Sequence, residues 1–179
     1  MSSGYKFESR EELNTAVSLW IDDETSAIET YGDINTWDVS AISDFSKLFQ
    51  YKTSFNDDIS NWDVSSGNNF YAMFDIALSF NQDLGSWDVS SGYTFNAMFY
   101  GATSFNQDIS SWDVSKSNNF QGMFAGASKF NRNISSWDVS SANNLSAMFS
   151  GATEMLTNQP LASTPSNYFD ITKNLDTRK

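Results

Sequence analysis

The sequence predicts an α/β solenoid in which five 25-residue coils each contribute a short parallel β-strand and a short helix. Two observations carry this prediction: the tetrapeptide Trp-Asp-Val-Ser recurs every 25 residues without an insertion, and the spacing of apolar residues changes within each unit. A fixed period of this length is typical of repeat architectures, in which each unit buries its apolar side chains against the next. The tryptophans of the five units are Trp37, Trp62, Trp87, Trp112 and Trp137.

Three further apolar columns keep the same 25-residue step. Each column places one large side chain in every coil, and burying one such side chain contributes roughly 2 to 3 kcal/mol. The apolar content therefore suffices for a cooperative fold. The columns are Phe45, Phe70, Phe95, Phe120 and Leu145; Phe49, Phe74, Phe99, Phe124 and Phe149; and Phe55, Phe80, Phe105, Phe130 and Met155.

The apolar period changes from two to helical inside the unit 62–86. Trp62 and Val64 alternate with Asp63 and Ser65, which predicts a short strand with one buried face. A stripe with i, i+3, i+4, i+7 spacing follows and predicts a short amphipathic helix. The stripe consists of Phe70, Met73, Phe74 and Ala77.

Helix-boundary residues support this interpretation. The residue before each stripe is one whose side chain can cap free backbone N–H groups. After the stripe come Gly101, Gly126 and Gly151, which turn through positive φ at low cost. Tyr51 and Ile76 occupy the same column, so glycine helps there without being obligatory. The capping residues are Asp44, Asn69, Thr94, Asn119 and Asn144.

The chain is expected to be a single domain with capped ends. Residues 1–33 are predicted to form an N-terminal helical cap, because an apolar stripe follows the acidic pair Glu11 and Glu12. Residues 34–156 form the repeat region, and residues 157–179 form a C-terminal tail or cap. The stripe of the N-terminal cap is Leu13, Ala16, Val17 and Trp20.

Composition limits the function. The 179 residues carry a net charge of −12, which repels nucleic acid and anionic membrane surfaces. Histidine and cysteine are both absent, so Ser-His-Asp, Cys-His and zinc-hydrolase sites cannot be built. No secretory signal peptide or transmembrane span is visible. We therefore expect no enzyme, no cofactor, no nucleic-acid partner and no direct membrane insertion.

One unit, Phe105-Asn-Gln-Asp-Ile-Ser-Ser-Trp-Asp-Val-Ser115, with the Met-Phe and Gly-Ala-Ser that follow it, resembles the repeat of BspA-like surface proteins, also called DUF285. The resemblance covers about residues 30–156. It implies a leucine-rich-repeat-like right-handed solenoid, with a parallel β-helix as the alternative, and it implies a surface or extracellular location and a role in adhesion. The family commonly has Val-Thr-Asp-Met before the helix, and this chain keeps the usual Val only as Ile42 of the first unit, Ile42-Ser-Asp-Phe45.

An aspartate column is the first candidate site, because the strand interpretation lines its carboxylates up on an exposed face. Neighbouring like charges about 5 Å apart repel by roughly 0.8 kcal/mol in water, so something must offset the repulsion. The main interpretation is structural: each Asp accepts hydrogen bonds from the serine two residues on. A Ca²⁺ or partner-binding stripe is the alternative. The column is Asp38, Asp63, Asp88, Asp113 and Asp138.

The variable positions are the second candidate site, because recurring positions serve the fold. Exposed tyrosines suit protein contacts, and a solvated rim is the alternative interpretation. A column beginning with Asn56 is expected to be structural, with each Asn side chain bonding the backbone of the neighbouring coil. The variable positions are Tyr71, Tyr93 and Tyr100, together with Asp75, Asn96 and Gln121.

These observations favour a non-catalytic protein-interaction or adhesion module that binds a protein or glycan partner. The alternative is a structural subunit of a larger assembly, such as an envelope, a virion or a multiprotein complex. The location is expected to be the cell surface or extracellular space from the resemblance. The absence of a visible signal peptide leaves an intracellular or virion-borne location open.

Overall fold

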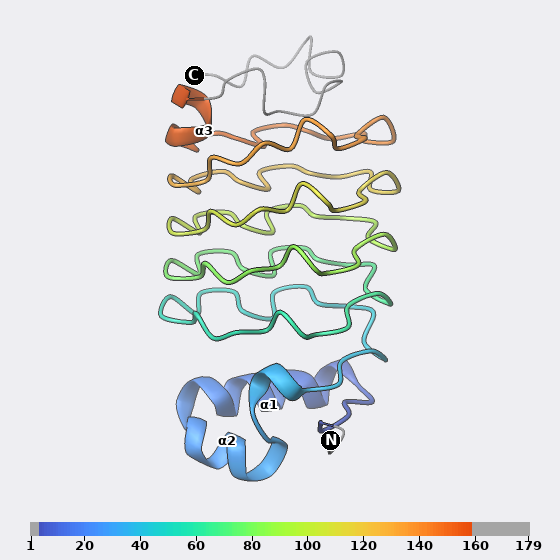
Figure 1. Cartoon of the computed structure of the whole chain (residues 1–179), viewed down its shortest axis with the longest axis vertical. Coiled ribbons are helices and arrows are strands. Elements are labelled where there is room, and N and C mark those ends of the chain that lie inside the picture. Colours follow the sequence, from blue (N-terminus) through green and yellow to red (C-terminus); the bar gives the residue numbers. More distant parts are fainter. Residues whose placement is uncertain (1–3, 159–179) are drawn as a thin grey trace.

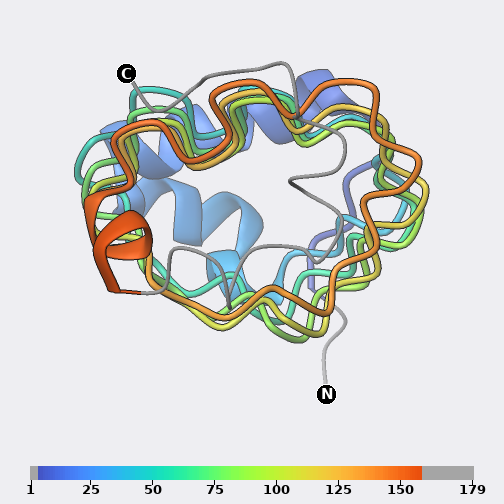
Figure 2. The ribbon, with the colours of Figure 1, turned by 90° about the horizontal axis from the view of Figure 1, so that it is seen from above.

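The computed structural model describes residues 4–158 and shows a stack of closed coils with helices at its N-terminal end (Figure 1). The helices are α1 (Arg10–Asp22), α2 (Glu24–Tyr31), a 3-10 helix η1 (Ile34–Thr36) and α3 (Thr153–Asn158). Seen from above, the coils superimpose around a common axis (Figure 2). The sequence-predicted C-terminal tail or cap lies, from residue 159 on, outside the described residues.

The predicted secondary structure of the coils is wrong. The described coils between η1 and α3 contain no helix and no strand of a sheet. The β-bridges between successive described coils are isolated and parallel, with one pair of residues at each step. The chain is therefore not an α/β, leucine-rich-repeat-like solenoid with a strand and a helix in each coil, and the parallel β-helix fails for the same reason. The bridges are Asp44↔Asn69, Asn69↔Thr94, Thr94↔Asn119 and Asn119↔Asn144.

The segment predicted as a helix is instead a run of tight turns, here called the turn run: residues 45–52 and their equivalents at 25-residue steps. Alternate N–H groups donate to the next coil, as from Ala97 to the Gln121 carbonyl at 2.8 Å. The N–H groups between them donate to the carbonyl three residues earlier in the same coil and so close tight turns, as from Tyr100 to the Ala97 carbonyl at 3.1 Å. Because these bonds replace the i→i−4 bonds of an α-helix, no helix can form.

Backbone dihedrals of the turn run are also incompatible with a helix. One residue in every four has positive φ, whereas an α-helix needs φ near −63°. Yet the side chains predicted to be buried are all buried, including Phe70, Met73, Phe74 and Ala77 at 0% exposure. The apolar spacing thus predicts correctly which side chains face the core, but not the backbone that places them there. The positive-φ residues are Lys47, Tyr51, Ala72, Ile76, Ala97, Gly101, Gly122, Gly126, Ala147 and Gly151.

The Trp-Asp-Val segment, predicted as a strand, forms no ladder among the described coils for a related reason. Trp62 and Val64 are buried and Asp63 is exposed, as the alternation predicts. However, the bond to the preceding coil comes from the side chain: the Trp62 indole N–H donates to the Ile34 carbonyl at 2.8 Å. The equivalent bonds of Trp87, Trp112 and Trp137 are 2.9 to 3.2 Å long. The indole N–H thereby makes the bond between coils that a backbone N–H makes in a β-sheet.

Stacked aromatic rings fill the interior. Phe74 lies between Phe49 and Phe99, with ring centroids 5.4 and 5.5 Å away and ring planes within 2° of parallel. Phe74 also stacks on Phe80 of its own coil at 4.0 Å. Aromatic pairs at such distances add about 0.5 to 1.5 kcal/mol beyond the burial of their area. The 25-residue period is therefore enforced by ring contact as well as by backbone bonds.

The N-terminal end is closed by α1 and the segment before it. The four apolar residues predicted to form a stripe are buried on α1, which confirms that helix over Arg10–Asp22. Phe7 and Trp20 pack on Trp37 with centroids 5.0 and 5.8 Å away. The Phe7 N–H also donates to the Asp38 carbonyl at 2.9 Å. This end of the tryptophan column is therefore covered by the chain's own aromatic residues.

A glycine substitution tests the turn run. Ala97 has φ of 53°, so Ala97→Gly relieves about 1 kcal/mol of left-handed strain and offsets the entropy that glycine adds to the unfolded chain. We expect Ala97→Gly to leave the free energy of unfolding within about 0.5 kcal/mol of the wild type in urea titrations.

Ala102→Gly in the same coil is the control. Ala102 is fully buried and has negative φ, so the same substitution should cost about 1.5 to 2 kcal/mol. Equal losses at the two positions would contradict the turn-run geometry.

Candidate functional site

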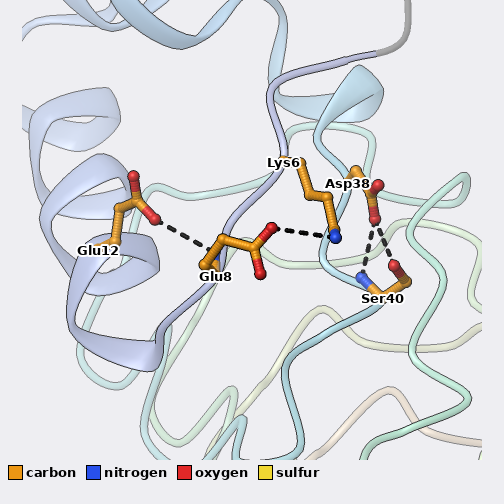
Figure 3. A network of polar contacts seen from close by, with 5 residues as sticks. All are labelled: Lys6, Glu8, Glu12, Asp38 and Ser40. Atoms are coloured by element: carbon orange, nitrogen blue, oxygen red, sulfur yellow. Dashed lines mark hydrogen bonds and ion pairs between the residues drawn. The ribbon is translucent and has the colours of Figure 1, made fainter.

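In the aspartate column, the carboxylates accept hydrogen bonds from the serine two residues on, which was the main interpretation from the sequence. Oδ1 of Asp38 accepts the Ser40 backbone N–H at 3.0 Å and the Ser40 hydroxyl at 2.6 Å (Figure 3). Asp63 and Asp113 repeat both bonds with the serines two residues on. Each carboxylate thus closes a tight turn within its own coil. Within residues 4–158, no three His, Cys, Asp or Glu side chains gather closely enough to hold a metal ion.

These hydrogen bonds explain how the column tolerates its own repulsion. The serine hydroxyl, and next the serine N–H, hold the pKa of Asp38, Asp88 and Asp113 below the ordinary value of an aspartate. For Asp88, repulsion from Asp113 opposes this shift but is a smaller contribution. Hydrogen bonding to the charged form therefore outweighs the repulsion between neighbouring coils.

The first aspartate has an additional neighbour in the N-terminal segment. Lys6 forms an ion pair with Glu8 at 3.0 Å, and the Glu8 N–H donates to the Glu12 carboxylate at 3.2 Å (Figure 3). The charge of Lys6 also helps to lower the pKa of Asp38. These contacts join the segment before α1 to that helix, and backbone bonds of Asp38 with Tyr5 and Phe7 tie the segment to the first coil.

The asparagine column confirms the predicted ladder. Oδ1 of Asn56 accepts the Asn81 N–H at 2.8 Å, and the same bond joins Asn81 to Asn106 and Asn106 to Asn131. The ladder ends at Asn131, whose Oδ1 is buried and has no hydrogen-bond donor in the described part of the chain. Each bond here fixes one coil on the next.

A shallow cavity of about 380 Å³ lies beside the end of this ladder. Its lining is polar and includes Asp108, Asn131 and Arg132. Arg132 was not identified from the sequence. In the structure its Nε donates to the Asn106 carbonyl, which repeats the bond that Gln82 and Gln107 make to an asparagine carbonyl in earlier coils. The column already varies, with Asp57 in the first coil and Gln82 and Gln107 in the next two, so the change to arginine is a weak signal in the sequence.

Three half-exposed tyrosines lie on the turn runs of the first three coils, and we call Tyr51, Tyr71 and Tyr100 the tyrosine surface. Their exposed fractions are 60%, 39% and 47%. Tyr93, the third tyrosine predicted from the sequence, is also exposed but lies on the preceding turn, where its N–H donates to the Asn68 carbonyl. Tyr51 was not among the binding residues predicted from the sequence, because three of the five residues in its column are glycines and the column was interpreted as a turn position.

Asp75 lies within this surface. The Tyr51 N–H donates to the Asp75 carbonyl at 2.8 Å, and Tyr100 follows Asp75 in the same column, one coil further on. Oδ2 of Asp75 accepts from the Gln50 amide at 2.7 Å, whereas the buried Oδ1 has no donor among the described residues. The ammonium of Lys47 lies over the Tyr71 ring, 5.3 Å from its centroid. Tyr71 and Asp75 thus lie on one turn run and Tyr100 lies on the next, while the aspartate column comes from a separate segment of each coil.

The stacked 25-residue units define a tandem-repeat protein. A family model described as "Mycoplasma protein of unknown function, DUF285" matches residues 21–121 and 93–173, so the chain belongs to this family. No curated protein and no solved structure matches the chain. No described helix is long and apolar enough to cross a membrane.

The aspartate–serine bonds predict an acid-sensitive fold. Because the pKa values of Asp38, Asp88 and Asp113 are lowered on folding, their stabilising contribution is present above the unfolded pKa of about 3.9 and is lost as pH falls through the folded values. Ser115→Ala should raise the pKa of Asp113 toward the ordinary value, as followed by NMR titration of its carboxyl carbon.

Ser111→Ala is the matched control, because the Ser111 hydroxyl donates to the Gly85 carbonyl and not to an aspartate. The pKa of Asp113 should not move in this variant. An unchanged pKa in Ser115→Ala would show that the hydroxyl does not cause the shift.

Proposed function

We propose that the chain is a non-catalytic protein-interaction or adhesion module whose tyrosine surface binds a partner protein. The observation that supports this proposal is the uneven distribution of aromatic residues on the turn runs. The columns of Tyr51, Tyr71 and Tyr100 end in small residues in the fifth coil. Because exposed tyrosines are enriched in protein interfaces and the repeat does not require them, they point to contact with a partner. The fifth-coil residues are Gly151, Ser146 and Ser150.

The rest of the chain supports a scaffold without catalytic chemistry. The sequence contains no histidine or cysteine, and the recurring aspartates close turns in successive coils. The interior contains columns of stacked aromatic rings and offers a rigid support for surface side chains. A net charge of −12 disfavours nucleic acids and anionic membranes as partners.

The resemblance to the BspA-like surface-protein repeat adds adhesion and a location at the cell surface to the proposal. A partner in that setting is a protein of a neighbouring cell or of the extracellular matrix. The exposed tyrosines suit such a contact because each ring offers a large apolar area and a hydroxyl at low entropic cost.

The test replaces each tyrosine by the residue that the fifth coil carries in the same column: Tyr51→Gly, Tyr71→Ser and Tyr100→Ser. These exposed substitutions should leave the melting temperature nearly unchanged. Proteins from the native organism and its surroundings are captured on the wild-type chain and identified. We expect the triple variant to bind the captured partner at least tenfold more weakly in interferometry.

Tyr93→Ser combined with Ile28→Ser is the control, because both residues are exposed but lie outside the tyrosine surface. This variant should bind as the wild type does. If the triple variant binds every captured partner with wild-type affinity, the proposed function is wrong.

A further inference from the structure

Asp75 is an acidic residue that the repeat does not explain. The aspartates of the recurring columns accept the N–H two residues on, as Asp63 and Asp113 do. The column of Asp75 instead contains an amide, a phenol, a methyl and a hydroxyl in the other coils, so the fold does not require a carboxylate there. These residues are Gln50, Tyr100, Ala125 and Ser150.

The environment of Asp75 is also incomplete. Asp75 is only 9% exposed, and Gln50 supplies a neutral hydrogen bond to one carboxylate oxygen. The other oxygen is buried without a donor in the described part of the chain. A buried carboxylate normally has a cationic or hydrogen-bonding partner for both oxygens, because leaving one unpaired is strongly unfavourable. The missing partner is thus a donor, preferably a charged one.

The surrounding rings suit a cation. Lys47 already lies over the Tyr71 ring, which shows that a ring of this surface accepts a positive charge on its face. Tyr51 and Tyr100 are connected to the Asp75 coil through backbone bonds on either side: Tyr51 donates to Asp75, and Ile76 donates to Tyr100. The residues that carry these exposed rings are therefore within one coil of Asp75 and its donor-free Oδ1. The net charge of −12 attracts a basic partner from a distance.

We propose that the tyrosine surface binds an arginine side chain of the partner protein, whose guanidinium donates to Oδ1 of Asp75 and stacks on a tyrosine ring. Arginine fits better than lysine because its planar group donates to a carboxylate and stacks on an aromatic face at the same time. Since Oδ1 is covered in the free chain, an exposed neighbour must move, and Tyr100 in the same column is placed to do so. This inference rests on the proposed function, whose surface it shares.

The experiment is an NMR titration of the full ¹⁵N-labelled chain with N-acetyl-arginine methylamide. The citrulline analogue has nearly the same shape without the charge and serves as the ligand control. Asp75→Asn removes the carboxylate of the site, and Asp88→Asn removes the same charge from the aspartate column. Tyr100→Leu is a second site variant that keeps Asp75. The amide spectrum of each variant also verifies that it is folded.

We expect saturable shifts at Tyr51, Asp75 and Tyr100 with the arginine ligand and none with citrulline. Affinity should fall at least fivefold in Asp75→Asn and in Tyr100→Leu and remain unchanged in Asp88→Asn. Equal weakening in Asp75→Asn and Asp88→Asn, or shifts spread along the aspartate column, would show attraction by net charge alone and overturn the inference.

The two proposals can fail separately. If the arginine ligand does not bind at Asp75 but the tyrosine triple variant still loses its partner, the interaction surface stands and arginine is the wrong ligand group. If arginine binds at Asp75 while the triple variant keeps its partner, the site exists but the proposed function of the surface is wrong.

Discussion

The structure depends on one constraint: about half of the backbone N–H groups of each turn run find their hydrogen-bond acceptors only in the next coil. Within the turn runs these bonds run in one direction: N–H groups of one turn run donate to carbonyls of the turn run in the coil that follows, as from Phe74 to Met98 at 2.8 Å. The first coil therefore presents carbonyls that no earlier coil can pair. At this end the Arg10 guanidinium, held by α1, donates to the Ser46 carbonyl. The cap is thus a chemical consequence of the bond direction as well as an apolar cover.

The same constraint separates scaffold from surface. Columns that recur bond the fold together: the tryptophan indoles and asparagine amides join successive coils, and the aspartates close turns within each coil. An insertion in one coil would displace all of these bonds and the stacked rings together, which agrees with the uninterrupted 25-residue period. We therefore expect functional residues where the side-chain type of a column differs from coil to coil, as at Asp75 and Tyr100.

The sequence predicts what each column buries but not the backbone that buries it. A stripe such as Phe70, Met73, Phe74 and Ala77 has helical spacing, and a run of turns with one left-handed residue in four reproduces this spacing closely enough to be mistaken for it. Non-glycine residues such as Ile76 and Ala97 at positive φ conceal the turn geometry, because local preference disfavours them there. The asparagine ladder and the aspartate–serine turns follow from short-range chemistry and could be predicted. Whether Oδ1 of Asp75 is buried without a donor in the described part of the chain depends on neighbouring coils, and no local pattern reveals it.

The most direct test of this account is the acceptor of the Ala97 N–H. Couplings through hydrogen bonds between amide nitrogens and carbonyl carbons identify the acceptor by NMR. The account predicts a coupling from Ala97 to the Gln121 carbonyl in the next coil, because this N–H and this oxygen are joined at 2.8 Å. A coupling from Ala97 to Tyr93, four residues back in the same coil, would place a helix there and contradict the account.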